Sequence, residues 1–381
     1  MEHGSIMTGQ KVVLLFGNLE MGGAERQGLL VARHLKDVCG AVVEVWGLGR
    51  LRGPVADQCE AWGIPWQAVP LHWGLRRRLP HLLRLWYRLR QAQPTVLLSY
   101  TKVPNLAAAL LWRVCGVRLC IWNQADAGLL LAPGLLHRLA IHQSTHFIVN
   151  AEGGRRFLQD TFGLQPQQLQ LIRNGIRLED PRADRRTWRE RLGVAEGICI
   201  AVMVANLSSY KDHDTLLQAW RLVLDRWSGA QPVLVLAGRF DDRAEALQRQ
   251  AAQLGIAGQV RFLGGVADVS GLLAASELCV HSSPSEGIPN AVLEAMAAGL
   301  AVTGSDIPGM REAVGDEGVV WLAPVADAFA LARLLERLLL DPAVRRQQGA
   351  LMQSRAAEQF GLERMCRETV DYLQAALDGT P

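Results

Sequence analysis

The sequence predicts an α/β fold with two domains, each built around a parallel β-sheet, the two sheets facing each other across a cleft. Three observations support this prediction. The chain has 381 residues, which exceeds the usual size of one domain. Short apolar runs alternate with amphipathic helical stretches from one end to the other. A charged segment with Pro181 and no apolar periodicity, residues 174–188, separates two such series and is typical of a linker.

Each expected strand is a short apolar run, and helix-length segments separate successive runs. In the first half the expected strands are residues 11–19, 41–48, 64–71, 95–100, 118–123 and 145–150. In the second half they are residues 198–207, 232–239, 260–263, 278–282, 301–305 and 318–322. We therefore predict an N-terminal domain over 10–177 and a C-terminal domain over 179–362, with ligands bound in the loops at the carboxyl ends of the strands.

Composition and charge exclude several function classes. Hydrophobic residues make up 49% and charged residues 20%, which is the balance of a folded protein. The net charge of +3 is too small to favour a nucleic-acid partner. The seven cysteines show no metal-ligand spacing, so we expect no metal site and reduced thiols. No run reaches the length of a membrane span and no signal peptide is apparent, so the sequence favours a cytoplasmic protein.

Gly22 and Gly23 follow the first expected strand and precede a helix start. Glycines in such a turn allow backbone amides to approach an anion closely. The spacing differs from the dinucleotide pattern G-x-G-x-x-G, and a glycine pair can also serve only as a tight turn. Phosphate contact and a plain turn both remain open on the residues alone.

Residues 282–299 read as a strand end, a loop and a helix that begins near Pro289. Glu286 lies in the loop and Glu294 in the helix. Free amides at a helix start favour a pyrophosphate, and carboxylates accept hydrogen bonds from sugar hydroxyls. The alternative is that Glu286 caps the helix and Glu294 is solvated. The segment contributes six donor-site candidates: Glu286, Gly287, Ile288, Pro289, Asn290 and Glu294.

Glu286 and Glu294 reproduce an E-x7-E pattern, and with it the chain resembles the retaining GT-B glycosyltransferases of family four, also called group 1. The resemblance covers nearly the whole chain. Further matching motifs are Gly22-Gly23-Ala24-Glu25-Arg26, Asn174-Gly175-Ile176, Ala205-Asn206-Leu207 through Lys211, Ala237-Gly238-Arg239 and Phe262-Leu263-Gly264.

The resemblance implies a GT-B fold of two Rossmann-like domains, with an acceptor-binding domain over 10–177 and a donor-binding domain over 179–362. The last segment, 363–381, is a helix that returns to the first domain. A hexose then moves from a nucleoside diphosphate sugar, expected to be a UDP-sugar, to an acceptor hydroxyl on a glycan, glycolipid or small molecule with retention of configuration. Such enzymes serve polysaccharide biosynthesis. No metal and no cofactor besides the sugar donor is implied.

The same resemblance assigns roles to individual residues. Glu286 contacts hydroxyls of the donor sugar and is named catalytic together with Lys211, which neutralises the donor diphosphate. Glu294 holds the nucleotide ribose. Gly22 and Gly23 close over the diphosphate from the first domain.

Two positions depart from the family pattern. Asn206 stands five residues before Lys211, where many relatives have a second diphosphate-binding arginine, so Arg239 or Arg311 is a candidate to compensate. Residues 122–126 lack a histidine that many relatives have near the acceptor. The candidates for acceptor contact are Lys102, Asn123, Gln124 and Asp126.

Residues 72–90 mix arginines with tryptophan, tyrosine and leucine on one expected helix. Such a helix can lie on an anionic membrane surface, which would place the protein at the inner face of the membrane. A helix that covers a sheet also turns leucines inward and arginines outward. Both interpretations remain open.

Two rival functions remain open as well. A nucleotide-sugar epimerase would use the same two-domain fold and consume a donor without an acceptor. A catalytically silent nucleotide-sugar-binding protein is the second rival, because Asn206 and the missing histidine depart from the family pattern. Product analysis separates these functions.

Overall fold

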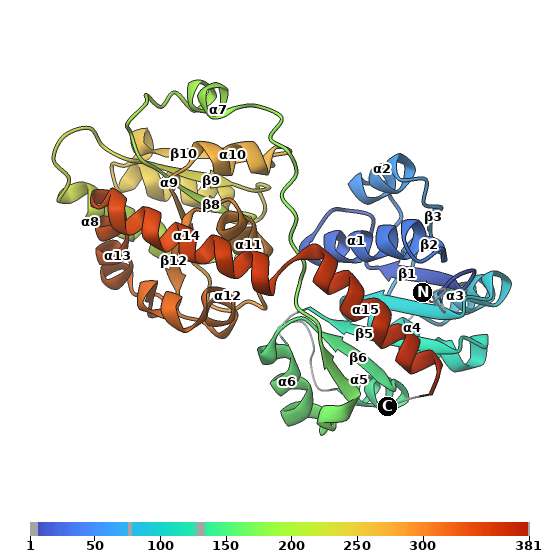
Figure 1. The fold of residues 1–381 in the computed structure, drawn as a ribbon. Helices are drawn as coiled ribbons and strands as arrows, with labels where there is room; N and C mark the ends of the chain where they lie inside the picture. Colours follow the sequence, from blue (N-terminus) through green and yellow to red (C-terminus); the bar gives the residue numbers. More distant parts are fainter. Residues whose placement is uncertain (1–6, 75–77, 126–127, 129–133, 380–381) are drawn as a thin grey trace, which may run out of the picture. The chain divides into compact units, whose positions relative to one another are not determined.

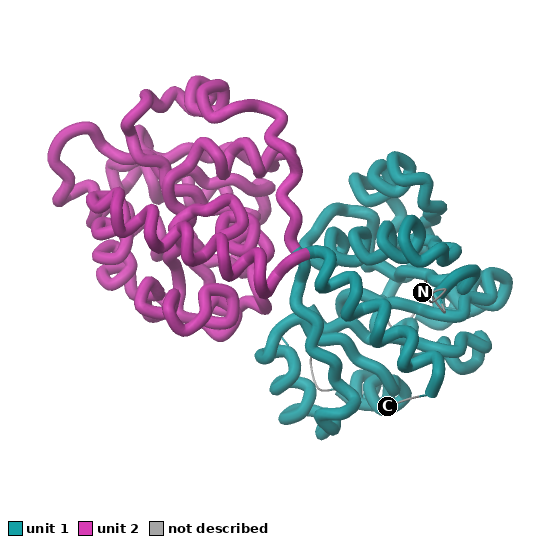
Figure 2. Tube along the Cα trace, viewed as in Figure 1, with its two compact units in different colours: residues 1–175, 362–381 teal, residues 176–361 magenta. Residues whose placement is uncertain are grey.

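The computed structural model describes residues 7–74, 78–125, 128 and 134–379. Two compact units divide the chain (Figure 2). The first unit contains the chain up to Gly175 together with everything from Leu362 onward, and the second contains Ile176–Gly361. The expected ranges 10–177 and 179–362 place the first division two to three residues after Gly175–Ile176 and the second next to Gly361.

The first unit has a seven-stranded sheet in the part of the chain that is described, and every strand runs parallel to its neighbours. The strand order is β3-β2-β1-β4-β5-β6-β7. The strands are β1 (Lys11–Phe16), β2 (Val42–Gly47), β3 (Trp66–Ala68), β4 (Val96–Tyr100), β5 (Leu119–Gln124), β6 (His146–Val149) and β7 (Leu169–Leu171).

Helices cover both faces of this sheet because alternate residues of its strands point to opposite sides (Figure 1). Val12 and Leu14 of β1 pack in one core cluster, which includes α1 (Gly23–Asp37) and α2 (Pro54–Ala61). Val13 and Leu15 pack in another, which includes α3 (Arg78–Ala92) and α4 (Lys102–Cys115). The remaining helices before the linker are α5 (Leu135–Gln143), packed against α4, and α6 (Glu152–Phe162).

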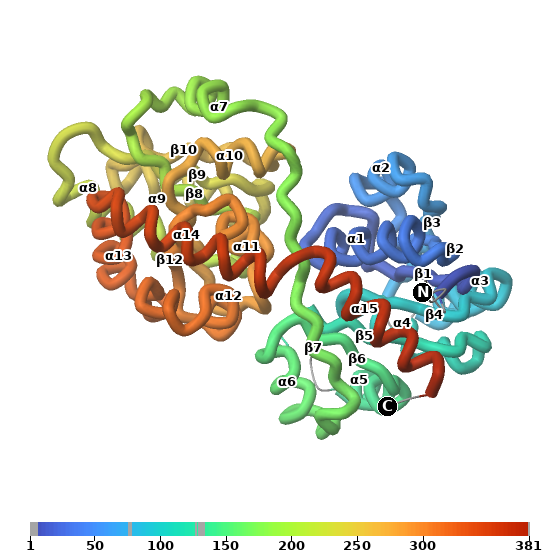
Figure 3. The backbone as a smooth tube through the Cα atoms, viewed as in Figure 1, coloured from blue at the N-terminus to red at the C-terminus, as the bar shows by residue number. Residues whose placement is uncertain are grey.

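The last helix, α15 (Leu362–Leu377), packs in the first unit beside α1. In Figure 3 the red end of the tube therefore belongs to the same unit as its blue start. Met365, Val370 and Leu373 of α15 are buried in the same cluster as Leu29 of α1. The helix expected at the end of the chain is thus present and contributes to the core of the first unit.

The second unit has a six-stranded parallel sheet in the order β10-β9-β8-β11-β12-β13. Its strands are β8 (Ile200–Val204), β9 (Val233–Ala237), β10 (Val260–Gly264), β11 (Leu278–His281), β12 (Ala301–Ser305) and β13 (Leu322–Ala323). Its helices are α7 (Arg185–Leu192), α8 (His213–Asp225), α9 (Ala244–Gln253), α10 (Val269–Ala275), α11 (Asn290–Ala297), α12 (Pro308–Gly318), α13 (Ala328–Leu340) and α14 (Pro342–Gln359).

Three details of the expected element pattern are wrong. The strand expected over 318–322 lies at Leu322–Ala323, because α12 extends to Gly318 and a 3₁₀ turn follows. Strand β7 was not expected, since it has only three residues, with polar Gln170 in the middle. The expected linker 174–188 contains the first turn of α7, where Asp184 caps the helix by accepting a hydrogen bond from the Thr187 amide.

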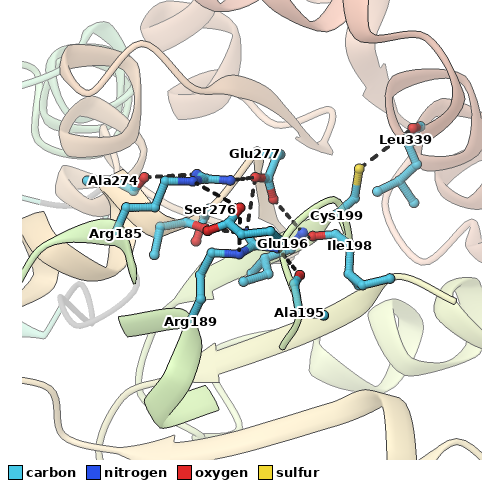
Figure 4. A network of polar contacts seen from close by, with 12 residues as sticks. Arg185, Arg189, Ala195, Glu196, Ile198, Cys199, Ala274, Ser276, Glu277 and Leu339 are labelled. Carbon is cyan, nitrogen blue, oxygen red and sulfur yellow. Dashed lines mark hydrogen bonds and ion pairs between the residues drawn. The ribbon is translucent and has the colours of Figure 1, made fainter. Parts of the chain in front are cut away.

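Arg189 fastens α7 to the amino ends of the strands in the second sheet (Figure 4). Its side chain is 2% exposed, and Nη1 donates to the Ala275 carbonyl at 3.0 Å and to Glu277 Oε1 at 3.2 Å. The second carboxylate oxygen of Glu277 accepts a hydrogen bond from the Ile200 amide at 2.7 Å. This buried network leaves the opposite, carboxyl edge of the sheet available for a site.

Within the described ranges, no helix combines the length and the apolar character that a membrane crossing requires.

Candidate functional site

The strand order of the second sheet reverses between β8 and β11, the two neighbouring central strands. Chains that leave such neighbours turn to opposite faces of the sheet, and a crevice forms outside the carboxyl ends of the strands. The loop after β8 spans residues 205–212 and the loop after β11 spans residues 282–289. Both loops carry residues that the sequence singled out.

Hydrogen bonds between these two loops fix them against each other. The Asp212 amide donates to the Ser282 carbonyl at 3.1 Å, and the Ser283 hydroxyl donates to the Tyr210 carbonyl at 3.3 Å. Asp212 also caps α8, since its carboxylate accepts a hydrogen bond from the Thr215 amide at 3.1 Å. The side chains between these anchors consequently have little freedom to separate.

Lys211 and Glu286 form an ion pair across the two loops. Each side chain is 19% exposed, so the alternative of a solvated lysine is wrong. Burial lowers the pKa of the Lys211 ammonium to about 8. The adjacent carboxylate favours the charged form. The lysine therefore remains mainly protonated at neutral pH, and the cation and carboxylate expected to bind the donor are brought together.

Two buried histidines complete this cluster, and neither was a sequence-predicted site residue. His281, the last residue of β11, places Nε2 3.2 Å from Glu286 Oε1. Burial and the charge of Lys211 hold the pKa of His281 well below its usual value. Burial also lowers the pKa of His213 to about 4, and its ring nitrogens have no hydrogen-bond partner among the described residues. Both imidazoles are neutral at pH 7.

Both histidines have only a weak signal in the amino-acid sequence. His281 ends an apolar run and reads as part of a strand, whereas His213 follows Lys211 by two residues at a helix start. The position of His281 five residues before Glu286 becomes informative only when the loop is seen to fold back on the strand.

Helix α11 begins at Asn290, after Pro289, and no side chain caps it. The reading of Glu286 as a helix cap is therefore wrong. Glu294 lies in the second turn and is only 5% exposed, so the reading of Glu294 as a solvated residue is wrong as well. A carboxylate rarely occupies a buried helix position without a specific partner or function.

The loop that carries Glu286 rests directly on α12. A Cβ atom placed on Gly309 would lie 1.5 Å from the Gly287 carbonyl oxygen, a distance that no side chain tolerates. Glycine at position 309 thus allows the two backbones to meet, and it fixes the height of the loop at the edge of the sheet.

Asn206 has a structural contact of its own. Its Oδ1 accepts a hydrogen bond from the Arg239 amide at 3.2 Å, which ties the loop after β8 to the loop after β9. The Arg239 guanidinium lies on the surface with Nε 3.7 Å from Asp241. Arg311 forms a two-pronged ion pair with Asp306. Compensation of Asn206 by either arginine stays a prediction.

The first sheet has its own reversal of strand order, between β1 and β4. Gly22 precedes α1 as its N-cap residue, Gly23 begins the helix, and both are exposed. Lys102 begins α4 directly after β4. Thr101, which the sequence did not single out, adopts φ 69° and ψ 170°, a conformation normally reserved for glycine. Strained residues of this kind are frequent where ligands bind.

Asn123 and Gln124 are buried and engaged inside the sheet. Asn123 Nδ2 donates to the Ser99 carbonyl at 3.0 Å, and Gln124 Oε1 accepts from the Trp122 indole at 3.0 Å. These contacts give both amides a structural role, and their contact with an acceptor stays a prediction. Asp126 lies outside the described residues.

Two family models match successive parts of the chain. Residues 21–180 match Glycosyltransferase Family 4, and residues 184–355 match Glycosyl transferases group 1. The second match contains Lys211, His281, Glu286 and Glu294, so it covers the whole cluster described above.

Curated relatives align over part of their length. A D-inositol 3-phosphate glycosyltransferase of Streptomyces avermitilis is 30% identical over 217 residues, which are 54% of this chain and 47% of the relative. The putative glycosyltransferase EpsD of Bacillus subtilis is 30% identical over 190 residues, which are 50% of this chain and 49% of the relative. The chain thus spans about half the length of these curated relatives.

Solved structures match over nearly the entire chain. Anabaena HepE in complex with UDP-glucose superposes with a TM-score of 0.83 at 20% identity, covering 96% of this chain and 99% of HepE. WaaG, a glycosyltransferase involved in lipopolysaccharide biosynthesis, superposes with a TM-score of 0.71 at 19% identity, covering 95% and 98%. At this identity the likeness concerns the fold. Together with the two family matches, it establishes that the chain belongs to the family 4, group 1 glycosyltransferases with the GT-B fold.

Proposed function

We propose that this protein is a retaining glycosyltransferase that moves a sugar from a UDP-sugar to an acceptor hydroxyl. The observation that carries the proposal is the pairing of Lys211 with Glu286 at the strand-order reversal of the second sheet. A half-buried cation beside a carboxylate suits a ligand with a diphosphate at one end and sugar hydroxyls at the other. The UDP-glucose bound to HepE supports the choice of donor class.

The roles of the residues follow from their chemistry. Lys211 turns from Glu286 to the diphosphate and stabilises the negative charge that develops on it. Glu286 accepts hydrogen bonds from sugar hydroxyls and orients the reacting sugar. Glu294, on the helix behind the loop, accepts hydrogen bonds from the ribose. The bond from the anomeric carbon to the phosphate oxygen breaks, a bond to the acceptor oxygen forms on the same face, and the acceptor proton passes to the departing diphosphate.

The remaining proposed contacts come from the first unit. Gly22 and Gly23, at the exposed start of α1, bind the diphosphate through backbone amides. Lys102, at the start of α4, binds an anionic or hydroxyl group of the acceptor. The charge needed at the leaving diphosphate comes from Lys211 and from amides at helix starts, so the reaction proceeds without a metal ion.

Product analysis tests the proposal. The protein is incubated with a panel of UDP-sugars and with glycan and lipid-linked acceptors, in the presence and absence of a chelator. We expect a glycoside whose NMR coupling constant shows the same anomeric configuration as the donor, in equal yield with chelator. A new nucleotide sugar formed without acceptor would indicate an epimerase, an inverted product would exclude retention, and activity restored only by magnesium or manganese would exclude the metal-free reaction.

We also propose that the protein contacts anionic membrane through the predicted segment 72–90, of which residues 78–90 belong to the helix α3. Leu79, Leu83 and Tyr87 recur every fourth residue along α3 and are 67%, 55% and 55% exposed. The inward side of the same helix already has Leu85 and Leu89, so covering the sheet does not account for the outer stripe. An exposed apolar stripe on a helix commonly marks an interaction site.

The charge around this stripe supports an anionic partner. Helices α3, α4 and α5 contain no aspartate or glutamate, and between residues 61 and 151 ten lysines and arginines accompany a single acidic residue. The rest of the chain has an excess of acidic residues. Arg84 and Arg88 are exposed beside the stripe. Apolar side chains flanked by arginines fit the interface of a bilayer that contains anionic lipid.

Vesicle sedimentation tests this surface. We expect binding to phosphatidylcholine vesicles that contain phosphatidylglycerol and little binding to phosphatidylcholine alone. The double variant Arg84→Ala, Arg88→Ala loses about 2 kcal/mol, or about 30-fold in affinity. Leu83→Asn places a polar side chain in the apolar stripe and should also weaken vesicle binding. Its matched control is Phe329→Asn, at an exposed phenylalanine of α13 in the other unit, which should not. Equal binding to both vesicle types, or equal loss in Phe329→Asn and Leu83→Asn, would exclude this contact.

A further inference from the structure

We infer that His281 is a positioning residue, whose Nε2–H holds the Glu286 carboxylate in place while Lys211 moves between Glu286 and the donor diphosphate. The inference rests on the proposed function, because it assigns the support that Glu286 needs during donor binding. It concerns a residue that touches Glu286 and does not itself touch the donor.

Glu286 Oε1 has two donors among the described contacts, Lys211 Nζ and His281 Nε2. An ammonium has three N–H donors, but its single positive charge is shared when a diphosphate approaches, so its hold on this oxygen weakens. When Lys211 turns to the diphosphate, the hydrogen bond from His281 remains. The carboxylate then stays at the place where the sugar hydroxyls meet it, and it does not follow the lysine.

The surroundings of His281 suit this role. The residue ends β11, its side chain is buried, and a Cβ on Gly304 of β12 would lie 2.1 Å from the His281 carbonyl oxygen. The neighbouring strand thus holds its backbone closely. A ring fixed in this way can direct one N–H at one oxygen without losing further conformational freedom.

The charge state of the ring matters as well. The charged and titratable groups that face it are Glu286, Lys211 and His213. Burial, followed by the charge of Lys211 and the presence of His213, keeps the pKa of His281 well below its usual value. A carboxylate accepts hydrogen bonds, so Nε2 of the neutral ring must carry the proton. The neutral Nε2–H group adds no positive charge beside Glu286. The carboxylate therefore keeps its full strength as a hydrogen-bond acceptor for sugar hydroxyls.

Two substitutions separate positioning from packing. His281→Gln keeps an N–H donor, and His281→Leu keeps a comparable volume without one. We expect both variants to bind UDP within threefold of wild type in calorimetry, because UDP lacks the transferred sugar that Glu286 is proposed to orient. With UDP-glucose, His281→Leu loses at least tenfold in the kcat of donor hydrolysis, and His281→Gln recovers to within threefold of wild type. The inference would be overturned by a kcat of His281→Leu equal to that of wild type, or by an equal loss of kcat in His281→Leu and His281→Gln.

A measurement on the unsubstituted protein tests the hydrogen bond independently of catalysis. Long-range ¹H–¹⁵N correlation spectra of ¹⁵N-histidine-labelled protein report which ring nitrogen carries the proton. We expect a neutral His281 ring protonated at Nε2 at pH 7, with a shift that changes in Glu286→Gln. A ring protonated at Nδ1, or a charged ring, would overturn the inference even if UDP-glucose is not a donor. If no UDP-sugar is a substrate but the spectra still show His281 protonated at Nε2, the proposed function alone would be contradicted.

Discussion

Lys211 offers the sharpest quantitative prediction. The substitution Lys211→Met removes the ammonium and keeps most of the apolar stem. Two unit charges 4 Å apart attract each other by about 4 kcal/mol at an effective dielectric constant near 20. Part of this attraction offsets the lost ion pair with Glu286, which leaves about 1.5–3 kcal/mol for a charge-assisted hydrogen bond to the diphosphate. UDP affinity should therefore fall about 10- to 150-fold.

UMP serves as an internal control for this variant. The proposed contact is mainly to the distal phosphate, so the affinity for UMP should fall less than the affinity for UDP. Lys211→Arg keeps the charge and should bind UDP more tightly than Lys211→Met. Isothermal titration calorimetry measures the UDP and UMP affinities of wild type and Lys211→Met, and the UDP affinity of Lys211→Arg.

The pH dependence of UDP binding follows from the pKa of Lys211, which is about 8. The bound diphosphate favours the protonated lysine, so the complex holds this proton more tightly than the free protein does. Affinity is then constant below pH 8 and weakens by up to tenfold per pH unit above it. Lys211→Arg stays charged and lacks this decline, and the titration of the nucleotide itself is common to both proteins. Identical pH profiles, together with unchanged UDP affinity in Lys211→Met, would refute the role of Lys211.

Three further substitutions test the site and its support. Glu294→Ala should weaken UDP binding by about 1.5–3 kcal/mol, since the ribose loses a charged acceptor, and calorimetry with unchanged affinity in a folded variant would exclude this contact. Gly309→Ala forces the loop away from α12 and should lower the free energy of unfolding by about 1–3 kcal/mol. Gly258→Ala is the control, because Gly258 has open space around it and the substitution should not destabilise the protein. Equal melting temperatures of the two variants would contradict the close contact at Gly309. Arg189→Met removes a buried guanidinium that donates to Glu277 and to the carbonyls of Ala275 and Ala195, while Arg185 stays paired with Glu277. The variant should cost about 1–3 kcal/mol in denaturant unfolding, against less than about 1 kcal/mol for the exposed Arg186→Met in the same helix; similar values for both would show that the network is not important for stability.

The apolar runs predicted the parallel sheets well because a strand buried on both faces needs a nearly continuous apolar sequence. Apolar runs do not predict a strand whose side chains are only partly buried. Strand β7 has three residues with Gln170 exposed in the middle, so its hydrogen bonds and not its side chains define it. The last strand was placed too early because α12 continues through Gly315, which has φ 70°, into a 3₁₀ turn.

The site was predictable to a similar extent. Glu286 and Glu294 stand out by their spacing around a helix start, whereas Lys211 is predicted only through the family resemblance. The structure brings Lys211 and Glu286 into contact. The sequence does not predict His281 as a site residue, because a histidine at the end of an apolar run cannot be distinguished from a core residue by sequence. Its role depends on the loop that returns Glu286 to the end of β11, which is a property of tertiary structure.

A crystal structure with UDP bound would show whether the donor site lies at the carboxyl ends of β8 and β11. We expect the diphosphate within hydrogen-bond distance of Lys211 Nζ. The ribose should contact Glu294, and the ion pair between Lys211 and Glu286 should be open while His281 still donates to Glu286. UDP bound elsewhere on the protein, or a diphosphate at this site with the ion pair between Lys211 and Glu286 intact, would contradict this expectation.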